Sequence, residues 1–444
     1  MVTNTFSDIL YNAALNVSYK EVGPEKKKNR KVCKKKKPWI DMECEEKYRT
    51  IKSLSRTLQE NPWDKQMRIK VYKPKKDFNK STRKKHRLYR NILINKIVES
   101  EKNNPNEFWT TIDTHKNRSS DPSSGISSHE WLTYFRDLMN VDYTNSFEVL
   151  QNVSLADYDS NVLNFEIRTE EVYKAVKTLK NQKACGTEGI NNEMLKLACS
   201  MNVGIFVVFN LILKSEVYPE LWRENYIKPI FKGGCLNNPS NYRGLALSSC
   251  FGKFFSKILH NRLDSFIEIN NILHMGQIGF RKGCRTSDHI FTLQTLIDKA
   301  FRSTKRLYAC FVDLKKAFDT VNRGALIYKL SCLGFKANFL NIMKNMYREV
   351  NYCVKLEEGI TDKFSSKVGV KQGCILRTTL FSLYINDLIQ SLDIEVCDLP
   401  ALDNEFIPCL LYADDIVLLS ESAEGLQHSL NALHHYCNKW DLPS

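Results

Sequence analysis

The stretch that most constrains this chain is Cys409-Leu-Leu-Tyr-Ala-Asp-Asp-Ile-Val-Leu-Leu419. Two apolar runs of strand-like composition flank the adjacent acids Asp414 and Asp415, a pattern that predicts a β-hairpin with carboxylates at its turn. Such a pair is costly between buried strands unless a positive charge, most simply a divalent metal ion, lies against it. Adjacent aspartates in a turn are also common and are usually just solvated, so the pair needs support from elsewhere in the chain.

A second apolar run of strand length, Leu307-Tyr-Ala-Cys-Phe-Val-Asp313, also ends on a carboxylate. If the two strands are neighbours in one sheet, we expect Asp313 to come level with Asp414, so that the oxygen ligands that Mg²⁺ prefers converge. Two such ions roughly 4 Å apart would activate an attacking hydroxyl and stabilise a leaving phosphate oxygen, as nucleotidyl transfer requires.

The positive charge of the chain is concentrated in its first quarter. The net charge of the 444 residues is +15, yet residues 1–118 hold 30 Lys and Arg against 14 Asp and Glu, whereas residues 119–444 hold 35 against 36. A polyanion is therefore the natural partner of the first segment. The 14 cysteines are scattered without a CxxC pair, so we expect reduced thiols in an intracellular protein rather than a zinc ribbon or disulfide framework. We expect neither a signal peptide nor a membrane span.

Basic runs continue through the segments that make up this first quarter. We expect residues 1–37 to be disordered, with lysine runs that act as a nuclear localisation signal or phosphate-binding arm, or that are only solvated. We expect residues 38–118 to form two long helices with basic faces, separated by a break near residue 61. We expect residues 119–164 to form a linker that leads into the following domain. The two helices either grip nucleic acid or only connect domains. The candidate nucleic-acid-binding residues of the second helix are Arg83, Lys84, Lys85, Arg87 and Arg90.

Six sequence blocks carry a resemblance to a known family. The blocks are Lys228-Pro-Ile-Phe-Lys232, Asn241-Tyr-Arg-Gly-Leu-Ala-Leu247, Gln277-Ile-Gly-Phe-Arg-Lys-Gly283, Phe311-Val-Asp-Leu-Lys-Lys-Ala-Phe-Asp319, Gly369-Val-Lys-Gln-Gly-Cys374 and Tyr412-Ala-Asp-Asp415. In this order and spacing, residues 165–444 resemble the reverse transcriptase domain of non-LTR (LINE-type) retrotransposons. Residues 38–116 also resemble the helical connector that precedes the polymerase in such proteins.

The resemblance implies an α+β fold of the right-hand polymerase type. Residues 165–305 would form the fingers and residues 306–444 the palm, an antiparallel sheet packed on helices and preceded by the basic helical connector. Asp313, Asp414 and Asp415 would be the catalytic, metal-binding acids for two Mg²⁺ ions, which Mn²⁺ could replace, with Asp415 the least essential. The primer 3′-hydroxyl would attack the α-phosphate of a dNTP and release pyrophosphate.

The resemblance also implies a nucleotide site. Phe318 lies where the family keeps a bulky ring against the sugar, which would select dNTP over rNTP. Gln372 and Gly373 match the loop that contacts the nucleotide and template base. Lys232 and Arg243 match the fingers residues that hold the triphosphate, although each alone is more often a surface charge.

Further implications concern the partners and the location of the protein. Arg281 is carried over as a template-side or structural residue. The partners would be an RNA template and a DNA primer, with no membrane. The location would be nuclear, with a cytoplasmic ribonucleoprotein stage.

The chain departs from the family at three points. After the Gln-Gly-Cys loop the family usually has Ser-Pro, whereas this chain has Arg377 and Thr378, so a long cation replaces a small residue and a helix cap is weakened. We also expect a chain truncated before the thumb, without an endonuclease ahead of the connector. The alternatives are therefore an active RNA-directed DNA polymerase domain, a catalytically dead RNA- or DNA-binding remnant, and a fragment without function.

Overall fold

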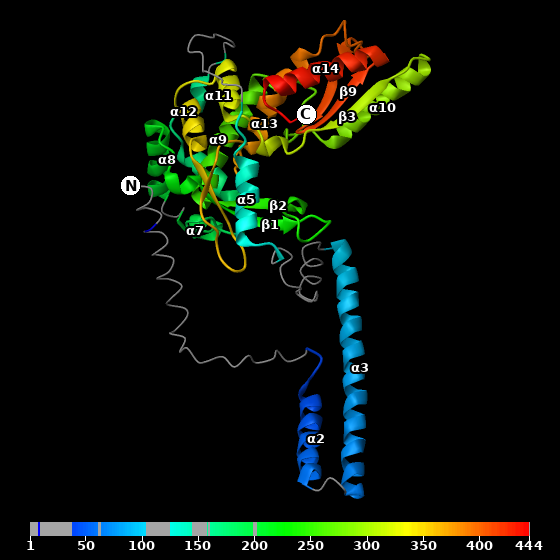
Figure 1. The fold of residues 1–444 in the computed structure, drawn as a ribbon. Coiled ribbons are helices and arrows are strands. Elements are labelled where there is room, and N and C mark those ends of the chain that lie inside the picture. Colours follow the sequence, from blue (N-terminus) through cyan, green and yellow to red (C-terminus); the bar gives the residue numbers. More distant parts are fainter. Residues whose placement is uncertain are drawn as a thin grey trace. The chain divides into compact units, whose positions relative to one another are not determined.

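The computed structural model describes residues 8, 38–60, 64–103, 125–143, 158, 160–198 and 202–443. The chain divides into two units, Gly23–Ser120 and a second made of Met1–Val22 with Asp121–Ser444. Figure 1 shows the helices and strands of both units. The expected disorder of residues 1–37 concerns a segment that, apart from Asp8, lies outside the described residues.

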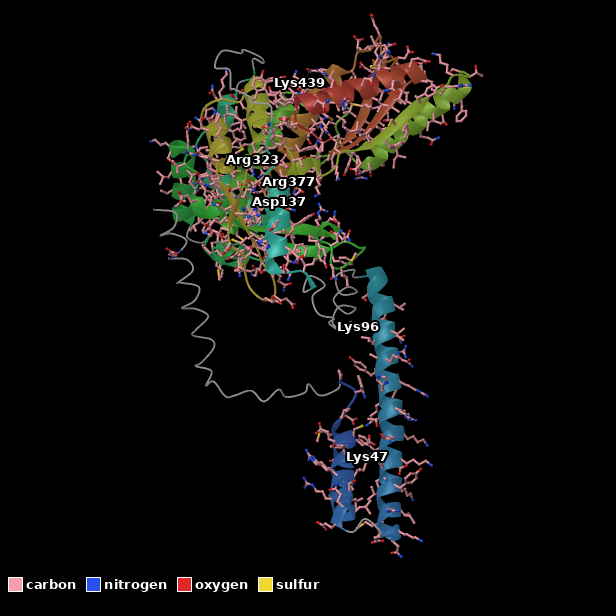
Figure 2. All side chains as sticks on the ribbon, in the orientation of Figure 1. Lys47, Lys96, Asp137, Arg323, Arg377 and Lys439 are labelled. Atoms are coloured by element: carbon pink, nitrogen blue, oxygen red, sulfur yellow. The ribbon has the colours of Figure 1, made fainter. Side chains whose placement is uncertain are left out.

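The first unit is a pair of helices, α2 (Met42–Glu60) and α3 (Lys65–Asn103), packed side by side. The contact between the two helical segments is partly ionic, because the Lys85 ammonium lies 2.6 Å from the Asp41 carboxylate and also pairs with Glu43. The hydrogen bond from Lys85 lowers the pKa of Asp41 to about 2. The two helices predicted for this segment are confirmed, and Figure 2 shows side chains projecting from α3 on either side of the labelled Lys96 and from α2 around the labelled Lys47.

The second unit contains a four-stranded sheet of order β2-β1-β4-β5. The central strand β1 alternates partly buried and buried residues over its first six positions, as a strand does when one face is covered. It pairs antiparallel with β2 and parallel with β4, and β4 pairs antiparallel with β5. The strands are β1 (Glu224–Phe231), β2 (Tyr242–Ser248), β4 (Val350–Val354) and β5 (Phe364–Ser366).

Helix α5 (Ser128–Met139) covers one face of this sheet. A capping box begins the helix, in which Ser127 and Glu130 bond each other's backbone N–H groups. Trp131, Phe135 and Met139 recur every four residues and are buried with side chains of the strands, as expected for an amphipathic helix. Residues 119–164, for which the sequence predicts a linker and lead-in, therefore contain a helix that is part of the packed unit.

A three-stranded antiparallel sheet of order β3-β9-β8 carries the acidic residues. Side chains alternate between its faces: Ile416 and Leu418 join the main core, whereas Leu410 and Leu419 pack with Leu296 of α10. Helices α14 and α10 thus flank the sheet (Figure 1). The elements are β3 (Tyr308–Asp313), β8 (Cys409–Tyr412), β9 (Asp415–Ser420), α10 (Thr286–Arg302) and α14 (Ala423–Lys439).

The main core lies among the remaining helices. Helix α9 (Cys250–Ile269) contributes most to it, with Phe251, Phe254 and Phe255 fully buried. The other helices are α6 (Thr169–Lys177), α7 (Asn192–Ala198), α8 (Asn202–Ser215), α11 (Arg323–Cys332), α12 (Ala337–Tyr347) and α13 (Arg377–Ile385), and a small hairpin joins β6 (Ala401–Leu402) to β7 (Glu405–Phe406). Helices and antiparallel sheets in one unit confirm the predicted α+β class, while the boundary between fingers and palm stays a prediction. Within the described ranges, no helix combines the length and apolar character needed to cross a membrane.

Candidate active site

The acidic pair lies at the tip of the β8–β9 hairpin. Tyr412 and Asp415 are the last paired residues, so Ala413 and Asp414 form a two-residue turn. Ala413 has φ 59°, the left-handed conformation that the first turn position of a type II′ hairpin requires. The predicted hairpin with carboxylates at its turn is confirmed.

A buried glutamine fixes this turn from the side. The side-chain oxygen of Gln277 accepts hydrogen bonds from the N–H groups of Gly279 at 3.0 Å and Ala413 at 3.3 Å. A Cβ on Gly279 would lie 2.2 Å from the nitrogen of Ala413, so only glycine lets the two backbones approach this closely. These contacts hold Ala413 in a conformation that a non-glycine residue otherwise avoids.

Asp313 ends the neighbouring strand β3 and pairs in register with Asp415. The expectation that Asp313 comes level with Asp414 is one residue off, because the two-residue turn takes up Asp414. Asp313 and Asp414 nevertheless line the same pocket, whereas Asp415 borders an adjacent apolar groove. Burial raises the pKa of Asp414, and repulsion from Asp415 and Asp313 raises it further.

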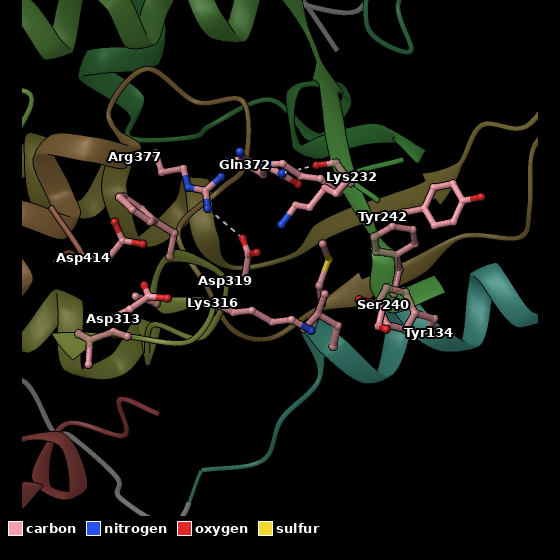
Figure 3. A pocket seen from close by; sticks show the side chains of 18 residues that line it. Tyr134, Lys232, Ser240, Tyr242, Asp313, Lys316, Asp319, Gln372, Arg377 and Asp414 are labelled. Atoms are coloured by element: carbon pink, nitrogen blue, oxygen red, sulfur yellow. Dashed lines mark hydrogen bonds and ion pairs between the residues drawn. The ribbon is translucent and has the colours of Figure 1, made fainter. Parts of the chain in front are cut away.

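The pocket has a volume of about 260 Å³ and receives charged side chains from both sheets and their connecting segments (Figure 3). Arg243 lies on β2 opposite Ile230, and Lys232 follows β1, where its N–H donates to the carbonyl of Asn241 at 2.9 Å. The structure therefore brings Lys232 and Arg243 to the acids, as the resemblance implies. The charged lining residues are the cations Lys232, Arg243, Lys316 and Arg377 and the acids Asp313, Asp319 and Asp414.

The Gln372–Gly373 loop is bound to β2 and forms another wall. The side-chain amide of Gln372 donates to the backbone carbonyl of Gly244. The backbone carbonyl of Gln372 accepts a hydrogen bond from the Ser248 hydroxyl at 3.2 Å. Gly373 has φ 83°, and a Cβ there would lie 3.0 Å from the carbonyl oxygen of Ala246. Glycine is thus needed both for the backbone conformation and for the close approach to β2.

Phe318 lies in a short 3₁₀ helix, Ala317–Asp319, directly after the strand that ends on Asp313. Its ring packs 4.4 Å from the Phe381 ring, and the Arg377 guanidinium lies 4.7 Å from the Phe318 ring centre. Arg377 also forms an ion pair of 2.9 Å with Asp319. Sequence reasoning gives no role to Asp319, although it lies in the same block as Asp313 and Phe318.

Two further lining residues, Tyr134 and Lys316, are also missed by sequence reasoning. Lys316 has φ 54° and places its ammonium 5.5 Å from the centre of the Tyr134 ring. Tyr134 comes from α5, in the segment predicted as linker and lead-in. The signal that could have identified this helix is the Ser127-x-x-Glu130 capping box, followed by an apolar residue every fourth position.

The predicted nucleic-acid-binding residues lie elsewhere. Arg281 forms a two-bond ion pair with Glu268, at 2.9 and 3.0 Å, and does not line the pocket. In the helical pair of the first unit, Lys85 bonds Asp41, which precedes α2, and Glu43 of α2. The other four candidates, Arg83, Lys84, Arg87 and Arg90, are exposed on α3. Their contact with nucleic acid stays a prediction.

The acids of the pocket fit a metal bound together with substrate. Among the residues that the structure describes, no three His, Cys, Asp or Glu side chains form a ready-made metal cluster. Mg²⁺ is commonly bound by one or two carboxylates that are completed by substrate phosphates and water. Asp313 and Asp414 could supply such a pair, and Lys232 and Arg243 line the same pocket.

Comparison with known families gives the class of the domain. The family described as "Reverse transcriptase (RNA-dependent DNA polymerase)" matches residues 230–443. This range includes strands β2, β3, β8 and β9, the Gln372–Gly373 loop and all three acids. Residues 230–443 are therefore a reverse transcriptase domain.

The curated relatives are polymerases of mobile elements. The chain is 30% identical over 284 residues to the probable RNA-directed DNA polymerase from transposon BS of Drosophila melanogaster, covering 62% of the chain and 31% of the relative. It is 24% identical to the polymerase of the mobile element jockey of the same species, covering 62% and 30%. It is 29% identical to the Pol polyprotein of the type-1 element R2 of Popillia japonica, covering 58% and 35%. The chain is thus similar to reverse transcriptases of non-LTR retrotransposons, and it spans about a third of the length of these relatives.

Proposed function

We propose that this domain extends a DNA primer on an RNA template, using two divalent ions at Asp313 and Asp414. The observation that carries the proposal is the convergence of these two acids with Lys232 and Arg243 in one pocket. The ions would be Mg²⁺, with Mn²⁺ as a substitute, because hard carboxylate oxygens suit both. Asp415, whose strand pairs with Asp313, would contribute charge and serve as the third acid.

The residues of the pocket divide the work of nucleotidyl transfer. Bound divalent ions would favour ionisation of the primer 3′-hydroxyl and stabilise the pyrophosphate leaving group. Lys232 and Arg243 would hold the triphosphate of the dNTP by charge-assisted hydrogen bonds. Phe318 would leave no room for a 2′-hydroxyl, and Gln372, fixed to β2, would position the base. The primer and template would therefore need to enter over the acidic edge of the three-stranded sheet.

A second candidate function is RNA or DNA binding without catalysis. Two observations favour it: Arg377 occupies part of the pocket, and α3 exposes a row of basic residues. Phosphate contacts of this kind are independent of sequence and depend steeply on salt. For both functions we propose a nuclear location with a cytoplasmic ribonucleoprotein stage, on the basis of the basic runs within residues 26–37.

Primer extension separates the two functions. Incorporation of dNTP on an RNA template with an annealed DNA primer should require Mg²⁺ and disappear in Asp414→Asn, while RNA binding persists. Asp403→Asn is the matched control, since Asp403 is an exposed aspartate in the turn of the β6–β7 hairpin. Extension that is equal in Asp414→Asn and Asp403→Asn would rule out the assignment of Asp414.

A binding readout tests the metal site independently of activity. Mg²⁺ should raise the unfolding midpoint of the wild-type chain, because a ligand that binds only the folded state stabilises it. The rise should shrink in Asp313→Asn and Asp414→Asn and persist in Asp403→Asn. An equal rise in all four proteins would mean that Mg²⁺ binds elsewhere.

A further inference from the structure

Arg377 is the one cation of the pocket lining that forms an ion pair with an acid of the same lining. It is the first residue of α13, and its side chain reaches back to Asp319. Phe381, one turn further along α13, packs on the same Phe318 ring that the guanidinium contacts. The side chain of Arg377 is only 16% exposed, so it lies within the pocket rather than in the surrounding solvent.

The bonding of Arg377 differs from that of a structural arginine. The guanidinium of Arg323 donates to the carbonyls of Tyr347, Ser366, Val368 and Gly369, and also to the Ser366 hydroxyl. Figure 2 labels both arginines. Arg377, in contrast, makes its ion pair through one nitrogen, and its buried Nε has no hydrogen-bond partner among the described residues. A buried donor left unpaired is unfavourable, so moving Arg377 breaks fewer hydrogen bonds than moving Arg323 would.

Arg377 occupies part of the pocket that the proposed function assigns to the nucleotide. The Arg377 guanidinium also covers the Phe318 ring, where the sugar of an incoming nucleotide would lie. Arg377 must therefore move before a sugar can lie against Phe318, and its ion pair with Asp319 is the contact that this movement breaks.

We propose that Arg377 is a removable latch on the nucleotide pocket. In the closed state, Asp319 holds the guanidinium over Phe318, and a nucleoside triphosphate binds only after Arg377 has moved away. The latch rests on the proposed function, because it assumes that the pocket takes a triphosphate. It makes Arg377 a residue that lowers nucleotide affinity rather than a ligand of the phosphates.

The test is the affinity of the full chain for dGTP with Mg²⁺, measured by calorimetry without primer. Arg377→Ser should tighten binding about twofold to fivefold, which is the gain expected from no longer breaking a partly exposed ion pair. Arg302→Ser, a change of the same charge at the exposed last residue of α10, should leave affinity unchanged. Unchanged or weaker binding by Arg377→Ser would overturn the latch and make Arg377 a wall or phosphate contact.

Asp319→Asn provides a second variant, which keeps the arginine but removes its anchor. It should also tighten binding, and in the Arg377→Ser background its effect should largely disappear, since the two residues act as a unit. Equal effects of Asp319→Asn in both backgrounds would contradict the latch.

Lys232→Ala separates the latch from the proposed function. Weaker dGTP binding in Lys232→Ala, with no gain in Arg377→Ser, would leave the nucleotide site standing and overturn the latch alone. Absence of dGTP binding in the wild type and in Arg377→Ser would overturn both.

Discussion

Gly373 lies in a loop of the proposed nucleotide site and needs a backbone conformation that disfavours a Cβ. We therefore expect Gly373→Ala to lower the stability of the chain. Its φ of 83° lies in the left-handed region, where a residue with a Cβ costs about 1–2 kcal/mol. The added Cβ would also lie 2.9 Å from the Ser248 hydroxyl oxygen. That hydroxyl donates to the carbonyl of Gln372 at 3.2 Å, and losing such a bond costs about 1 kcal/mol. We expect Gly373→Ala to lower the free energy of unfolding by about 2–3 kcal/mol.

Gly283→Ala separates the two parts of this cost. Gly283 has nearly the same φ, 84°, but within the described part of the chain no atom lies within 4 Å of the Cβ that alanine would add. It should therefore lose only the conformational part, about 1–2 kcal/mol. Urea unfolding followed by tryptophan fluorescence gives both values, and dGTP affinity should fall in Gly373→Ala because the loop carries Gln372. If Gly373→Ala destabilises the chain no more than Gly283→Ala, the close contact with β2 is not the constraint inferred here.

Two further predictions concern buried and exposed cations. Burial lowers the pKa of Lys371 from 10.5 to about 8, so between these pH values the unfolded chain holds a proton that the folded chain has lost. The contribution of Lys371 to the free energy of unfolding therefore rises with pH by up to about 3 kcal/mol across this window. Urea unfolding at pH 7.5 and 10 should show this rise in the wild type and not in Lys371→Met. On α3, replacing Arg83, Lys84, Arg87 and Arg90 by alanine should reduce the slope of log K for single-stranded RNA against log salt by about 3. Lys85→Ala should change that slope less, because its ammonium already pairs with Asp41 and Glu43, and an equal change per residue would contradict this assignment.

Local patterns were enough to predict the acidic hairpin and the two helices of the first unit. Apolar runs on both sides of Asp414 and Asp415 specify two strands and a turn without information from elsewhere in the chain. The register between β3 and β9 was predicted one residue off, because the turn length depends on the contacts of Gln277 with Ala413. Those contacts join residues 136 positions apart, and no local periodicity reports them.

The assignment of the cations of the site depends on the family resemblance rather than on residue patterns. Lys232 and Arg243 are ordinary surface charges when read singly, and only the order of the six blocks assigned them to a triphosphate. The structure places both on the pocket lining with Asp313 and Asp414. Tyr134 and the Arg377–Asp319 pair were not predicted, because each joins segments whose proximity depends on the packing of the whole unit.

The ion pair of Arg377 also decides which of two opposing effects should control nucleotide affinity. As a cation, Arg377 would attract a triphosphate, so its removal would weaken binding if charge alone mattered. Its charge is already balanced by Asp319 at 2.9 Å, and a closely paired charge exerts little net field on phosphates several ångströms away in salt solution. The ion pair with Asp319 does not remove the steric effect of the guanidinium, which still occupies the space over Phe318. Steric release should therefore outweigh the lost attraction, and raising the salt concentration should change the affinity ratio between Arg377→Ser and wild type by less than twofold.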